Sequence, residues 1–209
     1  MAEKNIKQKQ KSTIREYVEA ILIALLLALF IRTFVVQAFK IPSGSMKDTL
    51  LIGDHILVSK FIYGIKNPFN DATLIPFKKP QRRDIVVFKY PVNPTQDYIK
   101  RVVGLPGDTI EIKDKKVYVN DEPQEEKYAI FLDNKILPAH VQRRDNMGPI
   151  TVPENSLFVM GDNRDNSYDS RFWNFVDLKS VKGKAFILYW SWDKENFSVR
   201  WNRIANLVH

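Results

Sequence analysis

An uncharged apolar stretch near the N-terminus constrains this 209-residue chain more than any other feature. Residues 20–31 carry no charge over twelve positions, and at about 1.5 Å per residue a helix of that length covers roughly 18 Å. Crossing about 30 Å of hydrocarbon therefore requires the flanking residues, with Glu19 and Arg32 near the two interfaces. We predict a membrane anchor helix over residues 17–37, preceded by a basic tail over residues 1–16.

The distribution of charge indicates how this anchor is oriented. The formal net charge is +8, and residues 1–15 supply half of the excess through five basic residues against one acidic residue. Because basic residues mark the cytoplasmic side, we expect the tail in the cytoplasm and the chain after about Val36 on the other side. Anionic lipid explains a basic tail next to an apolar helix, so we predict membrane lipid as a partner and no nucleic acid.

Two other interpretations of the apolar stretch remain open. One is a cleaved secretory signal, because Val36-Gln37-Ala38 ends on the small residue that precedes a cut, and self-cleavage there is undecided. The other is an amphipathic helix buried in a soluble core. Retention is favoured because a serine-containing loop over residues 41–46 follows at once, and a tether would keep it close to the membrane plane.

The pattern after the anchor is typical of strands. Short segments rich in β-branched and aromatic residues alternate with turns such as Leu105-Pro106-Gly107-Asp108. We expect strands at residues 55–61, 84–90, 98–103, 109–113, 116–120, 157–160 and 185–190. The fourth and fifth of these predict a β-hairpin. The fold class is therefore mainly β, an antiparallel sheet domain over residues 38–209, with an irregular insertion over residues 121–149.

One serine and one lysine are the strongest candidates for chemistry. The chain has no cysteine and three histidines, which leaves no thiol nucleophile and few imidazoles. Ser45 lies in Pro42-Ser43-Gly44-Ser45-Met46, where proline and glycine allow a tight loop that a substrate can approach closely. Lys100 has apolar neighbours, and full burial is able to lower its pKa from about 10.4 to near 7, as a general base requires. Taken alone, each motif also fits a surface turn or a solvated strand end.

A third polar segment follows the strand at residues 157–160. Residues 161–171 hold an unusual density of polar and charged groups. A solvated loop and a calcium loop are both possible interpretations, but Arg164 occupies the third ligand position and no glycine stands at the sixth. We predict no metal there and expect ion pairs instead.

The motifs at residues 43–46, 84–91, 100–108 and 161–171 together resemble the sequence boxes of bacterial type I signal peptidases, the leader peptidase family with a Ser/Lys dyad. These enzymes are membrane-bound serine endopeptidases that remove signal peptides from exported preproteins. The resemblance covers residues 17–190. It implies a single-pass protein of the bacterial cytoplasmic (inner) membrane, with its catalytic domain on the outer face and its N-terminus in the cytoplasm.

The resemblance also implies roles for individual residues. Ser45 is the nucleophile and Lys100 the general base, while the Ser43 hydroxyl and the Ser45 backbone N–H form the oxyanion hole. Ser167 hydrogen-bonds the lysine amine, and Asp169 and Arg171 form a supporting ion pair.

The substrates implied are signal peptides of preproteins emerging from the secretion machinery, cut after Ala-X-Ala through an acyl-enzyme with no cofactor. The substrate is expected to add a strand to residues 84–88 and 98–100. The positions that match the family's two side-chain pockets are Phe39, Ile41, Pro42, Met46, Leu50, Ile56, Val87, Tyr98 and Ile99.

The sequence departs from the family pattern at two places, where Arg83 and Asn174 stand in positions that commonly hold glycine. Among rival functions, a penicillin-binding acylase needs a lysine three residues after the serine, where Asp48 stands. A self-cleaving repressor would lack the apolar segment. A membrane-tethered binding module is expected to have lost Ser45 or Lys100, and both are present.

Overall fold

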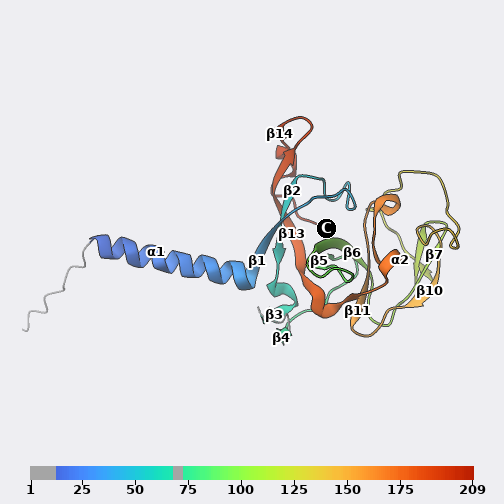
Figure 1. Cartoon of the computed structure of the whole chain (residues 1–209), viewed down its shortest axis with the longest axis horizontal. Coiled ribbons are helices and arrows are strands. Elements are labelled where there is room, and N and C mark those ends of the chain that lie inside the picture. Colours follow the sequence, from blue (N-terminus) through green and yellow to red (C-terminus); the bar gives the residue numbers. More distant parts are fainter. Residues whose placement is uncertain (1–12, 68–72) are drawn as a thin grey trace, which may run out of the picture.

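The computed structural model describes residues 13–67 and 73–209, so most of the basic tail lies outside the described residues. Helix α1 (Thr13–Phe30) continues into a π-helical turn (Ile31–Val35) and projects away from the β domain (Figure 1). Within the described part of the chain, Thr13–Val35 is the one helix long and apolar enough to cross a membrane. None of its apolar window is buried against protein, which contradicts the interpretation as a soluble core helix.

The predicted anchor extends two residues too far. Val36 and Gln37 belong to strand β1 (Val36–Lys40), where they lie opposite Ser59 and Val58 of strand β2 (Asp54–Ser59). The helix ends before Val36 because the backbone N–H and C=O groups of β1 form their hydrogen bonds with β2 instead. Ala38 is opposite Leu57 in the same ladder, so a cut after Ala38 would sever an intact strand.

The main sheet contains eight antiparallel strands among the described residues. Its order is β1, β2, β13, β5, β6, β11, β12, with β14 paired to β13. The remaining strands of this sheet are β5 (Ile85–Lys89), β6 (Asp97–Gly104), β11 (Ser156–Met160), β12 (Val176–Asp177), β13 (Val181–Asp193) and β14 (Ser198–Val199). The mainly antiparallel β-class predicted from the sequence is confirmed.

Two smaller sheets complete the architecture. The order of the first is β10 (Met147–Thr151), β7 (Thr109–Lys113), β8 (Lys116–Val119) and β9 (Glu122–Pro123), and it contains the predicted hairpin between β7 and β8. The second pairs β3 (Gly64–Lys66) with β4 (Thr73–Pro76). All seven predicted strands are present, whereas the sequence analysis missed β1 and most strands of two to five residues.

The predicted insertion over residues 121–149 holds β9 and the first residues of β10, and the described chain between them forms no further strand. It is nonetheless fixed to the polar segment at residues 161–171. The Ile130 N–H donates to the Asp162 carbonyl at 2.8 Å, and the Arg164 N–H donates to the Ile130 carbonyl at 3.0 Å. The insertion therefore packs as a cover on that segment.

Strand β5 explains why the interior is divided. Its first four residues are all buried, with Ile85 and Val87 in one hydrophobic cluster and Val86 and Phe88 in another. Because side chains alternate faces along a strand, β5 contributes to a hydrophobic core on each face of the sheet. Burial on both faces explains why its sequence is a continuous apolar run. The same alternation governs β6 beside it, the strand that carries Lys100.

Candidate active site

The loop that carries Ser45 is held on both sides. The Ile41 N–H donates to the Asp54 carbonyl at 2.8 Å, and the side chains of Met46 and Leu50 are completely buried in the cluster beneath. From the opposite side, the Asn163 N–H donates to the Ser45 carbonyl at 3.1 Å and the Asn163 side-chain amide to the Gly44 carbonyl at 3.0 Å. The serine is thereby fixed between the core and the segment at residues 161–171.

Lys100 lies directly against this serine. Its Nζ is 2.8 Å from Ser45 Oγ and also donates to the Ile99 carbonyl at 3.0 Å. The side chain is 4% exposed, and no carboxylate lies within ion-pair distance of it among the described residues. The two residues predicted to react are therefore in contact, although 55 positions apart in the sequence.

Burial changes the basicity of Lys100. Desolvation lowers its pKa to about 8, against the weaker opposing charges of Asp169 and Asp162, while the charge of Arg171 lowers it further. With a pKa near 8, roughly a tenth of the amine is neutral at pH 7. A neutral amine 2.8 Å from a hydroxyl is able to accept its proton.

Ser43 lies beside Ser45 on the solvent side. Its Oγ is 3.5 Å from Ser45 Oγ, and the residue is exposed. This arrangement places a second hydroxyl donor within reach of a group bound at Ser45.

Ser167 does not make the hydrogen bond that the family resemblance implied. Its Oγ is buried and has no hydrogen-bond partner within the described residues, and the Lys100 amine is engaged by Ser45 and Ile99 instead. The residue is nevertheless next to the site. A Cβ at Gly161 would lie 2.2 Å from Ser167 Oγ and 2.4 Å from the Ser45 carbonyl oxygen. Only glycine therefore allows the chain at Ser45 and the chain at Ser167 to approach position 161 this closely.

The ion pair between Asp169 and Arg171 is present as expected. Arg171 donates through Nε and Nη2 to the two carboxylate oxygens, each at 2.8 Å, and both side chains are at most 1% exposed. Burial alone would raise the pKa of Asp169, but the charge and hydrogen bonds of Arg171 outweigh it and hold the pKa below its usual value. Asp169 also accepts the Gly161 N–H at 3.0 Å, which fixes the start of the segment beside Ser45.

The sequence analysis missed a second buried ion pair because its members are 61 positions apart. Arg101, the neighbour of Lys100, donates to both oxygens of Asp162 at 2.8 and 2.7 Å. Its guanidinium also contacts the carbonyls of Arg83 and His209. The density of charge in residues 161–171 was the available signal, but it did not indicate the partner.

A cavity of about 360 Å³ opens over the serine and the lysine. Three of the predicted substrate residues line it, namely Pro42, Tyr98 and Ile99. The other six do not line it. They pack in or against the buried cluster beneath, because their apolar side chains face the sheet interior: Phe39, Ile41, Met46, Leu50, Ile56 and Val87. Four lining residues were not predicted as site residues: Gly44, Asp97, Asn166 and Tyr168.

The sheet also corrects where a substrate strand is able to pair. Val86 to Phe88 of strand β5 are paired on both sides, with β13 and with β6, so a substrate strand cannot pair along the predicted segment 84–88. The other predicted segment has an open edge. Residues Asp97 to Lys100 pair with β5 alone among the described strands, because β11 reaches β6 only from Arg101 onward.

Both unusual residues in glycine positions adopt a backbone conformation that favours glycine. Arg83 and Asn174 each have φ of 71°. A side chain at these two positions therefore carries a cost in backbone strain that glycine would avoid.

Comparison with known proteins extends over most of the chain. The family model described as signal peptidase, peptidase S26, matches residues 14–190. A curated signal peptidase I of Pseudomonas aeruginosa is 41% identical over 212 residues, which cover 88% of this chain and 75% of that protein. The signal peptidase I of Aquifex aeolicus is 32% identical, covering 85% of this chain and 84% of that one. A solved signal peptidase I of Enterococcus faecalis V583 is 38% identical, covers 52% of this chain and 97% of that one, and has a TM-score of 0.42.

Proposed function

We propose that Ser45 and Lys100 perform the reaction of this chain, which belongs to the signal peptidase family, peptidase S26, and is a serine peptidase of the signal peptidase I type. The family cleaves signal peptides from preproteins. The observation that carries the assignment of residues is the 2.8 Å contact between Ser45 Oγ and the buried amine of Lys100. A serine hydroxyl is a weak nucleophile until an adjacent base removes its proton.

The reaction proceeds through an acyl-enzyme. Ser45 Oγ attacks the scissile carbonyl while the neutral Lys100 amine takes its proton. The lysine then gives this proton to the departing amine of the mature protein, and in the second half it activates a water that hydrolyses the ester to Ser45. The developing oxyanion is stabilised by the Ser45 N–H and the Ser43 hydroxyl, which stands 3.5 Å from Ser45 Oγ. Donors of this kind are each worth about 3 to 4 kcal/mol in the transition state.

The signal peptide binds as an extended strand along the open edge of β6 at Asp97 to Lys100. Main-chain hydrogen bonds to such an edge give affinity, and pockets for alternate side chains give specificity. Pro42, Tyr98 and Ile99 line the cavity above the serine, and the cluster beneath it is densely filled by buried apolar side chains. Because this cluster leaves little room beneath the cavity, small residues are expected at the first and third positions before the cut, as in Ala-X-Ala.

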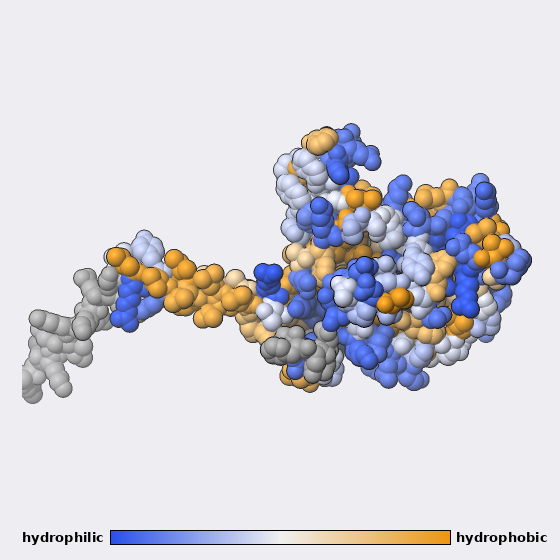
Figure 2. Space-filling view, in the orientation of Figure 1, coloured by the Kyte–Doolittle hydropathy of each residue, from blue (hydrophilic) through white to orange (hydrophobic). Residues whose placement is uncertain are grey.

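The enzyme is anchored in the bacterial cytoplasmic membrane with its catalytic domain on the outer face and with lipid as its neighbour. The support is the apolar helix Thr13–Val35, none of which is buried in the protein, and the five basic residues at positions 4–15. Basic residues stay on the cytoplasmic side of a spanning helix. Figure 2 shows the helix as an apolar rod that leaves the polar domain.

The test is cleavage of a model preprotein with an Ala-X-Ala site by the full chain in neutral detergent, between pH 6 and pH 10. The wild-type protein should cut after the second alanine, with kcat/KM rising about tenfold per pH unit up to pH 8, because only the neutral amine accepts a proton. Ser45→Ala and Lys100→Ala should each lose at least about a thousandfold. Lys100→Arg should also be inactive because guanidinium stays protonated.

Lys113→Ala, at an exposed position of β7, is the matched control and should cleave at the wild-type rate. Near-wild-type turnover by Lys100→Ala would overturn the assignment of the base. A folded wild-type protein that leaves the preprotein intact would overturn the proposed activity itself.

A further inference from the structure

One peptide unit, between Gly44 and Ser45, carries the N–H group that is proposed to stabilise the oxyanion. This peptide bond is trans, so its C=O and its N–H lie in one plane and point in opposite directions. Whatever fixes the direction of the Gly44 carbonyl therefore also fixes the direction of the Ser45 N–H. The Ser45 N–H donates to none of the described residues, which leaves it available to an oxygen of the substrate.

The side chain of Asn163 holds this carbonyl. Its Nδ2 donates to the Gly44 oxygen at 3.0 Å, and the Lys47 N–H donates to the same oxygen at 3.1 Å. Hydrogen bonds in a chain polarise one another, so a donor on the carbonyl strengthens the N–H of the same peptide unit as a donor. Asn163 therefore acts on both the direction and the strength of the Ser45 N–H.

The other contacts of Asn163 point to the same role. Its backbone N–H donates to the Ser45 carbonyl at 3.1 Å, so one residue holds the peptide units on both sides of Ser45. The residue is 1% exposed, and its Oδ1 has no hydrogen-bond partner within the described residues. Turning the amide over would place Oδ1 against the Gly44 oxygen, and neither atom has a proton to donate. The side chain is therefore used as a donor to the loop of Ser45.

Both chain neighbours of Asn163 are held in buried ion pairs. Asp162 accepts two hydrogen bonds from Arg101, at 2.8 and 2.7 Å. Arg164 donates two to Glu126, at 2.5 and 2.8 Å. A supporting residue positions a site accurately only when its own position is fixed, and these two ion pairs fix Asn163 from both sides.

We propose that Asn163 is a positioning residue that directs and polarises the oxyanion donor of Ser45, an inference that rests on the proposed function. It acts through the peptide unit between Gly44 and Ser45. Without the side-chain donor, this peptide unit is free to tilt and its N–H to turn away from the oxyanion. Because the oxyanion forms only in the transition state, the loss should lower kcat and leave KM almost unchanged.

The first test compares cleavage of the Ala-X-Ala preprotein by the wild-type full chain and by Asn163→Leu, in neutral detergent between pH 6 and pH 10. The variant should lose between about tenfold and a hundredfold in kcat, less than the hundred- to thousandfold of deleting an oxyanion donor outright. Its KM should stay within about twofold of the wild type. The rise of the rate up to pH 8 should also stay in place, because Lys100 keeps its contact with Ser45.

The second test uses two peptide ligands that differ only at the reacting carbon. In an Ala-X-Ala aldehyde, Ser45 Oγ adds to the aldehyde carbon and gives its proton to Lys100, and the former carbonyl oxygen becomes an oxyanion. The corresponding peptide alcohol forms no such bond. Asn163→Leu should weaken binding of the aldehyde by about the same factor as kcat and should bind the alcohol like the wild type.

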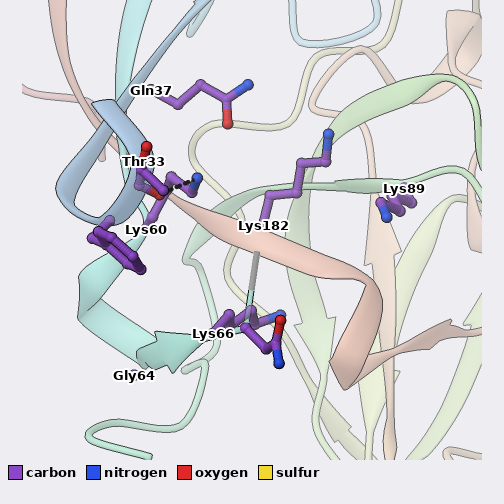
Figure 3. A pocket seen from close by; sticks show the side chains of 9 residues that line it. Thr33, Gln37, Lys60, Gly64, Lys66, Lys89 and Lys182 are labelled. Atoms are coloured by element: carbon purple, nitrogen blue, oxygen red, sulfur yellow. Dashed lines mark hydrogen bonds between the residues drawn. The ribbon is translucent and has the colours of Figure 1, made fainter. Parts of the chain in front are cut away.

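The matched control is Gln37→Leu, which removes another side-chain amide. Figure 3 shows Gln37 at a separate cavity of about 280 Å³ where the helix meets the sheet, and it does not line the active-site cavity. This variant should match the wild type in every measurement. If Asn163→Leu does not fold, Asn163→Asp replaces it at pH 8, since an ionised carboxylate has a similar shape but no proton to donate. It should show the same split between kcat and KM.

A wild-type kcat and aldehyde affinity in a folded Asn163 variant would overturn this inference alone. A loss that extends equally to KM and to the alcohol, with a shifted pH dependence, would show a merely structural role and would overturn it as well. A folded wild-type protein that leaves the preprotein intact would instead overturn the proposed function, and this inference with it.

Discussion

Strand β6 places a buried basic side chain on each of its two faces, and the two environments are opposite. Lys100 and Arg101 are consecutive, 4% and 1% exposed, and their side chains leave the strand on opposite sides. Arg101 meets a carboxylate, with two hydrogen bonds to Asp162 and a ring contact 3.9 Å from the centre of Tyr128. Lys100 meets a hydroxyl and a carbonyl. On one face a carboxylate balances the charge of Arg101, and on the other face burial without such a partner disfavours the charged form of Lys100.

The difference shows how one strand provides both support and reactivity. A buried guanidinium with a bidentate carboxylate stays charged and fixes the segment that begins at Gly161. A buried amine without such a partner has its pKa lowered to about 8 by desolvation, which makes a base of it near neutral pH. Exchanging the two environments would lose both functions.

Breaking the ion pair on the Arg101 face should give the largest effect on stability. Arg101→Met leaves the fully buried Asp162 carboxylate without its counter-charge and should lower the free energy of unfolding by about 3 to 5 kcal/mol. Urea unfolding of the full chain in neutral detergent measures this. The double variant Arg101→Met/Asp162→Leu is the control, because removing both charges should restore much of the loss. A single variant as stable as the wild type would show that the pair contributes nothing.

Removing the cation on the Lys100 face should have the opposite sign. The folded-state pKa of Lys100 is about 8 and its ordinary value is 10.5, so below pH 8 the folded protein bears the cost of a buried charge. Lys100→Met should therefore be more stable than the wild type at pH 7, by up to about 3 kcal/mol.

This advantage should shrink as the pH rises from 8 towards 10.5, where the unfolded chain also loses the proton. Unfolding curves at pH 7, 8, 9 and 10 for both proteins give the difference directly. Lys113→Met, on the exposed end of β7, should show no such trend. A stability difference that does not change with pH would contradict the lowered pKa.

The smallest expected change in stability comes from Arg83, in the turn whose carbonyl contacts Arg101. Arg83 has φ of 71° and its carbonyl accepts a hydrogen bond from the Arg101 guanidinium at 3.0 Å. Arg83→Gly should raise the free energy of unfolding by about 0.5 to 1 kcal/mol, because relief of the left-handed backbone exceeds the added entropy of the unfolded chain. Arg82→Gly, at the neighbouring position, is the comparison and should destabilise by removing the ion pair with Asp108. Destabilisation by Arg83→Gly would mean that its side chain matters more than its backbone.

The sequence was most informative where chemistry leaves a local signal. The apolar helix, the β7–β8 hairpin and the identities of Ser45 and Lys100 all follow from short patterns of residues. Burial of Lys100 was inferred from its apolar neighbours, and the structure agrees.

What the sequence did not indicate depends on register and distant contacts. The first two residues of strand β1, Val36 and Gln37, were assigned to the anchor because apolar residues continue past Arg32, and only their pairing with β2 reveals a strand. The partner of Arg101 is 61 positions away. The pairing of β5 on both sides follows from a sheet order that no local pattern specifies, and so does the packing of six predicted pocket residues in or against the buried cluster.

Strand β1 makes the connection between the apolar helix and the loop of Ser45 rigid and of fixed length. Five residues separate the helical segment from Ile41, and all five are paired with β2, so Ile41, where the loop of Ser45 begins, lies roughly 17 Å of strand beyond the helix. A flexible connection would let Ser45 reach peptide bonds at many different distances from the membrane. In the proposed membrane orientation, this paired strand would hold Ser45 at a fixed distance from the membrane, so the position of the cut would depend on how far a membrane-held substrate extends as well as on which residues flank the bond.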